Sequence, residues 1–423
     1  MNIKLFEVKK IITSPILIIL TAIFIIYNGF IIYENSYIRE DLKLANNLID
    51  KYGYEVNDGI IDMLQVEYDK KIIELNNVTR DRFNKEFNSI SEFLDSEEYK
   101  SVIYIGKEFT QEEIDLFVSL STIDLYKNSV IENIESYESI DIMNMAEGYI
   151  MDYELSGRAA ELVRENYKKL LPRFEELKNN KEHKKLFFVG TIYKTHSLLF
   201  RKIFGKCLLE IMALVVLMVG LVINYERENK TLSIVSVTKR GRNLVKDKLA
   251  VCIGGAITIT VIILGVTLIF YFITFDYTSI YNVPISSALN WELTPVISWY
   301  NISFIQYLSI CIVIAIVLAV IFTGIDFIIA SVLKDSYKTF FVFFMLFGLV
   351  FMLPRIIDNS YKLLIWSHYN VFILSLNPHM WLREAGPFMT DKYFMFKTLV
   401  SNGLAVLMLS YWCIKRFKKE NIS

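Results

Sequence analysis

Residues 203–248 read IFGKCLLEIMALVVLMVGLVINYERENKTLSIVSVTKRGRNLVKDK, an apolar run followed by a short charged segment. The apolar part, Ile203–Tyr225, is long enough to cross a hydrocarbon core of about 30 Å as a helix. The charged part, residues 225–248, begins acidic, has an apolar middle and ends basic. A membrane protein exchanges mechanical work with a soluble partner only through such a segment. The stretch therefore predicts membrane-spanning helices joined by a docking loop.

Five further apolar runs occur along the 423-residue chain, which is 53% hydrophobic. Together the runs predict six spans: Ile11–Tyr33, Ile203–Tyr225, Leu249–Phe275, Ser303–Val332, Thr339–Ile356 and Thr398–Ile414. The first span is longer than the apolar part of a signal peptide, and no small-x-small cleavage site follows it, so we expect it to remain as an anchor. The expected fold class is an all-α polytopic membrane protein with six transmembrane helices.

The distribution of Lys and Arg among the short loops predicts the orientation of these spans. If the N-terminus is cytoplasmic, the inner segments hold sixteen basic side chains and the short outer loops hold five. We therefore expect both termini in the cytoplasm and residues 34–200 outside, in a multi-pass protein of the plasma membrane. The excess of acidic residues within residues 34–200 gives no indication of nucleic-acid binding.

Three regions follow from this topology: residues 1–33 with an amphipathic helix and the first span, an extracytoplasmic domain at 34–200, and a five-helix region at 201–423. The outer domain is expected to be mainly helical, because apolar residues recur at spacings of three and four. The two stripes, which form its own core or contact a second copy, are Ile61, Leu64, Tyr68, Ile72 and Leu75, and Val163, Tyr167, Leu170, Phe174 and Leu177. Pro172 should kink or interrupt the second helix. Lys100–Gly106 predicts a short strand.

The outer segment at residues 357–397 is too apolar for a solvated loop and too interrupted for a span. Short helices that dip into the outer leaflet fit its composition, with Trp366, Trp381 and Tyr393 as interfacial anchors.

Residues that could perform chemistry are scarce. The chain has no phosphate-binding G-x-x-x-x-G-K-[ST] loop, no H-E-x-x-H and no G-x-S-x-G. Its four histidines show no metal-ligand spacing, and its four cysteines all fall within or at the ends of apolar spans, where they serve as small packing residues. We expect no catalytic residue, no metal site and no enzyme activity on this chain.

The segment 225–248 resembles the intracellular loop of the six-helix ABC exporter permeases, the type-2 class of ABC membrane subunits. In that family an acidic Glu-Arg ends the second helix, and Gly-Thr-Leu, an amphipathic coupling helix, a basic turn and Lys follow. The matching positions here are Glu226-Arg227, Thr231-Leu232, Lys239-Arg240-Gly241-Arg242 and Lys248. Lys230 stands where the family usually has Gly, and Thr238 where Pro is common. Two weaker similarities are the N-terminal Glu7-x-Lys9-Lys10 with Ser14-Pro15, and the break at Leu376-Asn377-Pro378.

The resemblance implies a permease that works in a pair, with the same or a related chain, on two cytosolic ATPase subunits that bind ATP and Mg²⁺. The substrate is expected to be amphipathic or hydrophobic, such as a peptide, a lipid-like molecule or a drug, exported across the membrane. Coupling to the ATPase is expected to run through Glu226, Arg227, Thr231, Leu232, Ile234, Val235, Lys239 and Arg240. The apolar residues would enter a cleft on the ATPase, and the basic ones would pair with its acidic rim or with anionic membrane lipid.

Two carboxylates within predicted spans are further candidates, because an unsheltered charge in hydrocarbon costs on the order of 3 kcal/mol. Asp326 and Glu210 either line a substrate path or the permease–permease contact, or serve structure alone. In the structural alternative, Glu210 pairs with Lys206 one turn away and Asp326 bonds a neighbouring helix.

A different class of function also fits the sequence: a membrane sensor or scaffold whose outer domain binds a ligand and whose inner loop recruits a cytosolic partner. Such proteins usually carry a cytosolic output domain, and the longest inner segment here has about 23 residues. Co-purification of an ATPase subunit would separate the two hypotheses.

Overall fold

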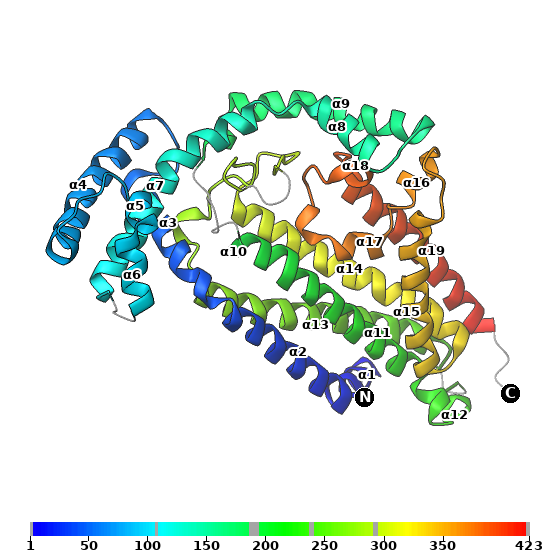
Figure 1. Cartoon of the computed structure of the whole chain (residues 1–423). Helices are drawn as coiled ribbons and strands as arrows, with labels where there is room; N and C mark the ends of the chain where they lie inside the picture. Colours follow the sequence, from blue (N-terminus) through cyan, green and yellow to red (C-terminus); the bar gives the residue numbers. More distant parts are fainter. Residues whose placement is uncertain (1–2, 106–108, 186–193, 237–240, 291–294, 420–423) are drawn as a thin grey trace.

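The computed structural model describes residues 3–105, 109–185, 194–236, 241–290 and 295–419 (Figure 1). Within these ranges the chain is helical and contains no β-strand. Six of the described helices are long and apolar enough to cross a membrane, which confirms the six predicted spans. They are α2 (Pro15–Glu34), α11 (Phe204–Glu228) with the turns before it from Lys194, α13 (Leu244–Thr274), α14 (Phe304–Leu333), α15 (Ser336–Met352) and α19 (Phe394–Lys419).

Helix α11 lies at the centre of the bundle. It packs against α13, α14, α15 and α2, and α14 in turn packs against α13, α15 and α19. In the most apolar part of the α11 span 72% of the residues are buried, whereas α15 and α19 each bury 17%. The outer helices therefore present most of their apolar side chains to the surroundings, as expected of helices that face lipid or a second membrane subunit.

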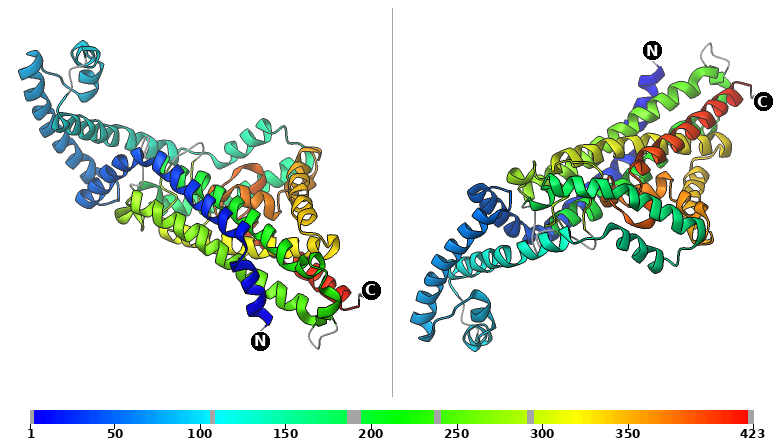
Figure 2. Two further views of the ribbon diagram at one scale, coloured as in Figure 1. Left: turned by 90° about the horizontal axis from the view of Figure 1, so that it is seen from below. Right: turned by 90° about the horizontal axis from the view of Figure 1, so that it is seen from above.

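The chain between α2 and α11 forms an arm and a cover (Figure 1). The arm, which is formed by the helices within residues 39–138, projects beyond one end of the bundle, as Figure 2 shows from two further sides. The cover consists of α8 (Ile142–Asp152) and α9 (Gly157–Asn179), which pack over the segment 357–397. The helices of this region are α3 (Arg39–Tyr52), α4 (Asp58–Phe83), α5 (Ile90–Asp95), α6 (Glu97–Ile105), α7 (Gln111–Glu138), α8 (Ile142–Asp152) and α9 (Gly157–Asn179).

The arm and cover helices begin at polar caps and bury the apolar stripes expected from the sequence. The side chains of Asn57, Ser89, Thr110 and Asp141 each accept a backbone hydrogen bond from the first turn of a helix. Every residue of the second stripe, from Val163 to Leu177, is at most 1% exposed, and Leu64, Tyr68 and Leu75 of the first stripe are also buried. The interpretation of both stripes as a helical core is confirmed.

In this region one local prediction was wrong, and one of the two alternatives expected at Pro172, an interruption of the helix, does not occur. The predicted strand at Lys100–Gly106 is helical as far as Ile105, and Gly106 lies outside the described residues. Glu97 and Glu98 favour the start of α6 because their charges complement the helix dipole, and Val102 is buried among neighbouring helices. Helix α9 runs through Pro172 without interruption, since its packed face outweighs the lost backbone hydrogen bond.

The outer segment between α15 and α19 contains three short helices, α16 (Lys362–Trp366), α17 (Val371–Leu376) and α18 (Gly386–Met389). Helix α17 ends at the expected Asn377-Pro378 break. Trp366 and Tyr393 are 60% and 53% exposed, but Trp381 is 1% exposed and donates its indole N–H to the Leu374 carbonyl at 3.0 Å. The prediction of Trp381 as an interfacial anchor was therefore wrong, because the ring fills the core beside Phe204.

Helix α9 is fastened to the outer loops of the bundle by buried polar side chains. The Arg173 guanidinium bonds both oxygens of Glu182 and donates to the Ser298 carbonyl at 3.0 Å. The Tyr167 hydroxyl donates to Glu384 in the outer segment. These contacts join the cover to two outer loops, so the three parts form one structure at this end of the molecule.

Candidate functional sites at the two ends of the bundle

At the end of the bundle that carries both termini, α11 leads into the short helix α12 (Leu232–Ser236) through a tight turn (Figure 1). The Thr231 N–H donates to the Glu226 carbonyl at 2.8 Å, and the Lys230 N–H donates to the Arg227 carbonyl at 3.1 Å. Lys230 itself has φ 56°, in the left-handed region. This pair of hydrogen bonds around a left-handed residue is the Schellman ending of a helix, which glycine favours. The Gly-to-Lys departure in the sequence thus falls on the one residue of the turn where glycine is conformationally preferred.

Helix α12 divides its apolar side chains between two faces. Leu232 and Val235 are half-buried, and so is Thr231, whose carbonyl accepts the Val235 N–H at 3.1 Å. Ile234 is 68% exposed. A branched apolar side chain at this exposure is available to a partner. Lys239 and Arg240, the basic residues expected to follow the helix, lie outside the described residues.

Next to α12, at the end of α11, a buried ionic network joins three helices. Glu226 of α11 accepts hydrogen bonds from Lys10 of α1 (Ile3–Ile12) at 2.7 Å and from Lys248 of α13. Lys10 also bonds Glu7 at 2.9 Å, and Lys248 donates to the Ile223 carbonyl at 3.2 Å. The side chains of these two cations and two anions are all at most 9% exposed, so the buried charge is balanced.

The residues on either side of Glu226 contact further helices. The ammonium of Lys10 lies 4.1 Å from the centre of the Tyr225 ring, and the Arg227 guanidinium lies 5.7 Å from the Phe417 ring of α19. The Glu228 carboxylate accepts the Ser336 N–H at 2.8 Å, at the start of α15. The four consecutive residues Tyr225–Glu228, which we call the α11 hub, therefore link the base of α12 to α1, α13, α15 and α19.

The predicted coupling residues thus fall into two groups. Glu226 is 6% exposed and faces the interior, so it is placed to hold helices together rather than to touch a soluble partner. Ile234, by contrast, is exposed and is placed to touch a soluble partner. The coupling role of these residues stays a prediction, and the bond between Lys10 and Glu226 was not predicted from the sequence.

Of the two carboxylates predicted within spans, Glu210 lies in a polar cluster between α2, α11 and α13. The Asn28 amide donates to Glu210 at 2.8 Å, and Thr267 is 3.3 Å from the same amide nitrogen. Lys206, the expected partner, instead donates to the Tyr27 hydroxyl at 2.7 Å. The predicted Glu210–Lys206 pair was wrong. Asn28 was missed, since a single Asn within an apolar run gives no indication of its neighbour.

Asp326 is fully buried in α14. In the described part of the chain, neither of its carboxylate oxygens has a hydrogen-bond partner. The expected bond to a neighbouring helix is therefore not formed among these residues. Two residues earlier, Gly324 brings α14 close to α19, because a Cβ built at Gly324 would lie 2.2 Å from Val406 Cγ1.

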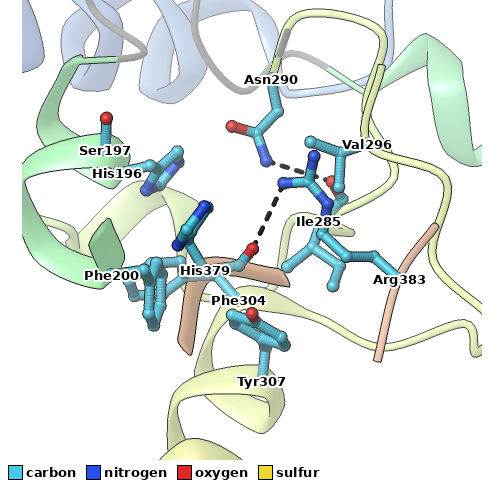
Figure 3. A pocket seen from close by; sticks show the side chains of 10 residues that line it. All are labelled: His196, Ser197, Phe200, Ile285, Asn290, Val296, Phe304, Tyr307, His379 and Arg383. Atoms are coloured by element: carbon cyan, nitrogen blue, oxygen red, sulfur yellow. Dashed lines mark hydrogen bonds between the residues drawn. The ribbon is translucent and has the colours of Figure 1, made fainter. Parts of the chain in front are cut away.

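At the opposite end, the outer loops enclose a small cavity of about 40 Å³ (Figure 3). Most of its lining residues are polar or aromatic, two are aliphatic, and they come from four segments: His196, Ser197, Phe200, Ile285, Asn290, Val296, Phe304, Tyr307, His379 and Arg383. Asn290 donates to the Ile285 carbonyl at 3.1 Å, and Arg383 donates to the His379 carbonyl at 3.4 Å. The volume suits a few water molecules.

A larger cavity of about 430 Å³ lies between α8, the end of α15 and the outer segment. Arg201, Arg355 and Arg383 line it together with aromatic and thioether side chains. One of the aromatic walls is the His368 ring, stacked on Phe388 at 4.3 Å between ring centres. A volume of this size accommodates a small organic ligand, and the lining provides both apolar surface and positive charge.

The comparisons with known proteins agree with this architecture. The chain matches the family model described as "ABC-2 family transporter protein" over residues 1–421. The match includes residues 34–200, which the sequence resemblance did not reach. No curated protein and no solved structure matches the chain. Among the described residues, no group of His, Cys, Asp and Glu is arranged to hold a metal ion.

Proposed function

Because this chain belongs to the ABC-2 family of transporter membrane proteins, we propose that it is the permease subunit of an ATP-driven exporter. Its substrate would be amphipathic or hydrophobic, and separate cytosolic ATPase subunits would bind ATP and Mg²⁺ and supply the energy. The family is one of transport membrane subunits rather than catalytic ones. This chain would form the path through the plasma membrane.

The observation that carries the proposal is the α11 hub at the base of α12. A soluble partner that pushed on Ile234 would move α12 against the end of α11. Glu226 would then shift against Lys10 and Lys248, and Glu228 against the start of α15. Since α11 is the most buried span, a displacement at its end reaches the helices that surround the centre of the bundle.

The distribution of basic residues supports the proposed orientation of the chain in the membrane. The basic inner segments predict that α12 faces the cytoplasm, so the arm and cover would lie outside. The 430 Å³ cavity lies at the outer end, where its aromatic walls and arginines suit an amphipathic substrate on its way out. Transport outward rather than inward rests on the family resemblance.

A second permease, either the same or a related chain, would complete the transporter. Of the six spans, α2, α15 and α19 bury the smallest share of their apolar windows, and their exposed side chains include Ile26, Phe341 and Leu407 at 67–73%. Such faces require lipid or another membrane helix beside them.

Purification together with the products of neighbouring genes tests the proposal. We expect an ATPase with a phosphate-binding loop to co-elute and to hydrolyse ATP. Ile234→Asp should abolish or strongly weaken co-elution, because a carboxylate cannot enter an apolar cleft without a large desolvation cost. Ile73→Asp is the matched control, since Ile73 of α4 is 63% exposed and lies on the arm.

Loss of the ATPase from the Ile234 variant alone would establish the coupling. If no ATPase associates with the unaltered chain under mild conditions, the transporter proposal fails. The sensor or scaffold hypothesis would then take its place.

A further inference from the structure

The first turns of the second span carry an unbalanced positive charge. Between Glu182 and Glu210 the sequence contains six Lys and Arg residues and no Asp or Glu. Four of the six, Lys194, Arg201, Lys202 and Lys206, fall within the described helix that leads into α11. Cations at a membrane boundary without compensating anions on the same helix are available to water, to headgroups or to an anionic ligand.

These four side chains line one groove of about 710 Å³, which we call the basic groove. Its opposite wall is the end of α2 and the turn after it, with Asn35, Tyr37 and Ile38. The groove lies at the end of the bundle opposite α12, and its size matches that of sites for small organic ligands.

Local backbone geometry gathers the cations on one side. Residues Ser197–Ile203 form a π-helix, whose turn is wider than that of an α-helix. Arg201 and Lys202 both reach the groove from within this segment, with Lys194 before it and Lys206 after it. Single π-helical turns inside longer helices occur frequently at functional sites.

Two of the four cations are not neutralised by the described residues. In the described part of the chain, Lys194 and Lys202 have no carboxylate within salt-bridge distance, and both are exposed. Lys206 is bound to a neutral group, the Tyr27 hydroxyl, and lies 4.6 Å from the centre of the Tyr27 ring. The groove is therefore a positively charged surface with donors available to an anion.

The remaining lining is apolar. Leu198, Leu209 and Leu376 line the groove beside the cations. Leu209 lies two turns beyond Arg201 along the span, in the direction of the bundle centre, and is 39% exposed. An occupant that satisfied both parts of the lining would have an anionic head near Lys194, Arg201 and Lys202 and an apolar tail along Leu209.

We propose that the basic groove binds the phosphate headgroup of an anionic amphiphile, with the acyl chain of that molecule lying against Leu198, Leu209 and Leu376. Arg201 also lines the 430 Å³ cavity at the outer end, so the groove and that cavity meet at one guanidinium. The bound molecule is a membrane phospholipid or a substrate of the same chemistry. The site is independent of the proposed function, because binding requires neither an ATPase nor transport.

The test is lipid binding to the purified full-length chain in detergent, measured by native mass spectrometry. The probes are dioleoyl phosphatidylglycerol, dioleoyl phosphatidylcholine with the same chains but no net charge, and glycerol 1-phosphate without chains. We expect phosphatidylglycerol to bind at least about tenfold more tightly than either of the others. Equal binding of the two lipids would overturn the headgroup part of the proposal, and equally tight glycerol 1-phosphate would overturn the apolar part.

The location is tested by substitution. Arg201→Gln with Lys202→Gln should reduce the affinity for phosphatidylglycerol about tenfold or more, since each basic residue near an anionic lipid contributes appreciably. Lys415→Gln with Arg416→Gln is the matched control, an adjacent exposed pair in α19 at the other end of the bundle, and should change the affinity less than about twofold. Equal losses in both variants would show general attraction to charged lipid and overturn the groove. The comparison of the probes on the unaltered chain holds even if a variant folds poorly.

To separate a resident lipid from a transported molecule, phosphatidylglycerol binding is measured again with the ATPase subunits and ATP present. A tenfold or greater loss of the bound lipid on ATP addition identifies a substrate, and unchanged occupancy identifies a resident lipid. Both results support an anionic site. If the unaltered chain bound no phosphatidylglycerol, the inference would be refuted and the transporter proposal would be unaffected.

Discussion

Lys230 adopts a backbone conformation that costs an ordinary residue about 1 kcal/mol and glycine almost nothing. We expect Lys230→Gly to raise the stability of the chain by roughly 0.5 kcal/mol, because relief of the left-handed strain outweighs the greater freedom of the unfolded state. The change should appear as a small increase in melting temperature in detergent.

A glycine at an ordinary helical position gives the opposite result. Lys168 is exposed in the interior of α9, and Lys168→Gly should lower stability by about 1 kcal/mol. If Lys230→Gly lowered the stability as much as Lys168→Gly does, the left-handed conformation at the end of α11 would be contradicted.

Glu226 holds two cations in a buried position, so removal of its charge leaves them undercompensated. We expect Glu226→Gln to destabilise the chain by roughly 3 kcal/mol, as is typical when one member of a buried ionic group is removed. Thermal unfolding of the purified chain measures the loss. Glu165→Gln, at an exposed position in α9, should have almost no effect.

Restoring the charge balance should restore much of this stability. Lys248→Met added to Glu226→Gln removes the second cation and leaves Lys10 paired with Glu7 at 2.9 Å. The double variant should therefore be more stable than Glu226→Gln alone. A double variant that is less stable would contradict the account of the network as a balanced set of charges.

At the scale of single residues, sequence patterns identified types of residue better than partners. The acidic Glu226 was recognised from its place before the coupling helix, yet its bonds to Lys10 and Lys248 span 216 and 22 positions. Glu210 was recognised as unusual within a span, but its partner Asn28 is 182 positions away. Helical spacing suggests only partners within one turn, which led to Lys206.

Between elements, α14 and α19 approach each other closely at Gly324. A side chain at Gly324 would meet Val406, whose β-branched side chain is stiff within a helix. Gly324→Ala should therefore lower stability by about 1–3 kcal/mol, the usual range for overpacking. Val406→Ala in the same chain should recover part of the loss, as measured by thermal unfolding.

Helix α19 supplies the matched control for this change. No atom lies within 4 Å of a Cβ built at Gly403, so Gly403→Ala should be neutral or stabilising by up to about 1 kcal/mol. Equal destabilisation at both positions would show that the α14–α19 contact does not depend on the absence of a side chain at Gly324.

The elements were largely predictable because long apolar runs and helical stripes are strong signals. All six spans were found, with ends that differ by several residues. The failures were short or local: Val102 and Ile103 suggested a strand, but α6 is set by packing in the arm, and Pro172 sits within a helix held by its neighbours. The weight of tertiary contacts at such positions cannot be obtained from the residues nearby.

For the molecule as a whole, acidic conditions should weaken the attachment between α7 and the cover. The His183 ring is 1% exposed, and its Nε2 atom lies 2.7 Å from Glu138 Oε1. Burial lowers the pKa of His183 below 6.5, against the opposing effect of Glu138. Below pH 6.5 the unfolded chain binds this proton more readily than the folded chain, so stability falls as the pH falls.

Glu138 acts in the same direction at lower pH. Hydrogen bonds from His183 and Lys184 lower its pKa below 4.5, so its contribution is present above pH 4.5 and is lost as the pH falls below that value. Hydrogen exchange in α7 and α9 at about pH 7.5 and about pH 5.5 measures the first effect, and His183→Asn should reduce the difference. If the His183 variant showed the same difference in exchange between the two pH values, the pH dependence would belong to other titratable groups.

The arrangement of the whole molecule was the least accessible from sequence. The order of spans and loops was correct, but nothing in it indicated that α9 would be fastened to two outer loops through Arg173 and Tyr167. Nor did it indicate that Ser298, in the segment before α14, would be fully buried and would accept a hydrogen bond from Arg173 of α9. Such contacts join parts far apart in sequence, where no local periodicity applies.

The far end of the arm has an aromatic core of its own. The rings that pack against one another there, Phe83, Phe87, Phe93, Tyr99, Phe109 and Phe117, all come from one short stretch of chain. Helix α7, with 28 residues, spans roughly 42 Å between this core and the bundle. A cluster that is formed by one stretch of chain and carried on a long helix is suited to exchange as a cassette. Its replacement would change what the arm contacts without altering the membrane-spanning helices, and a label for imaging can be attached there.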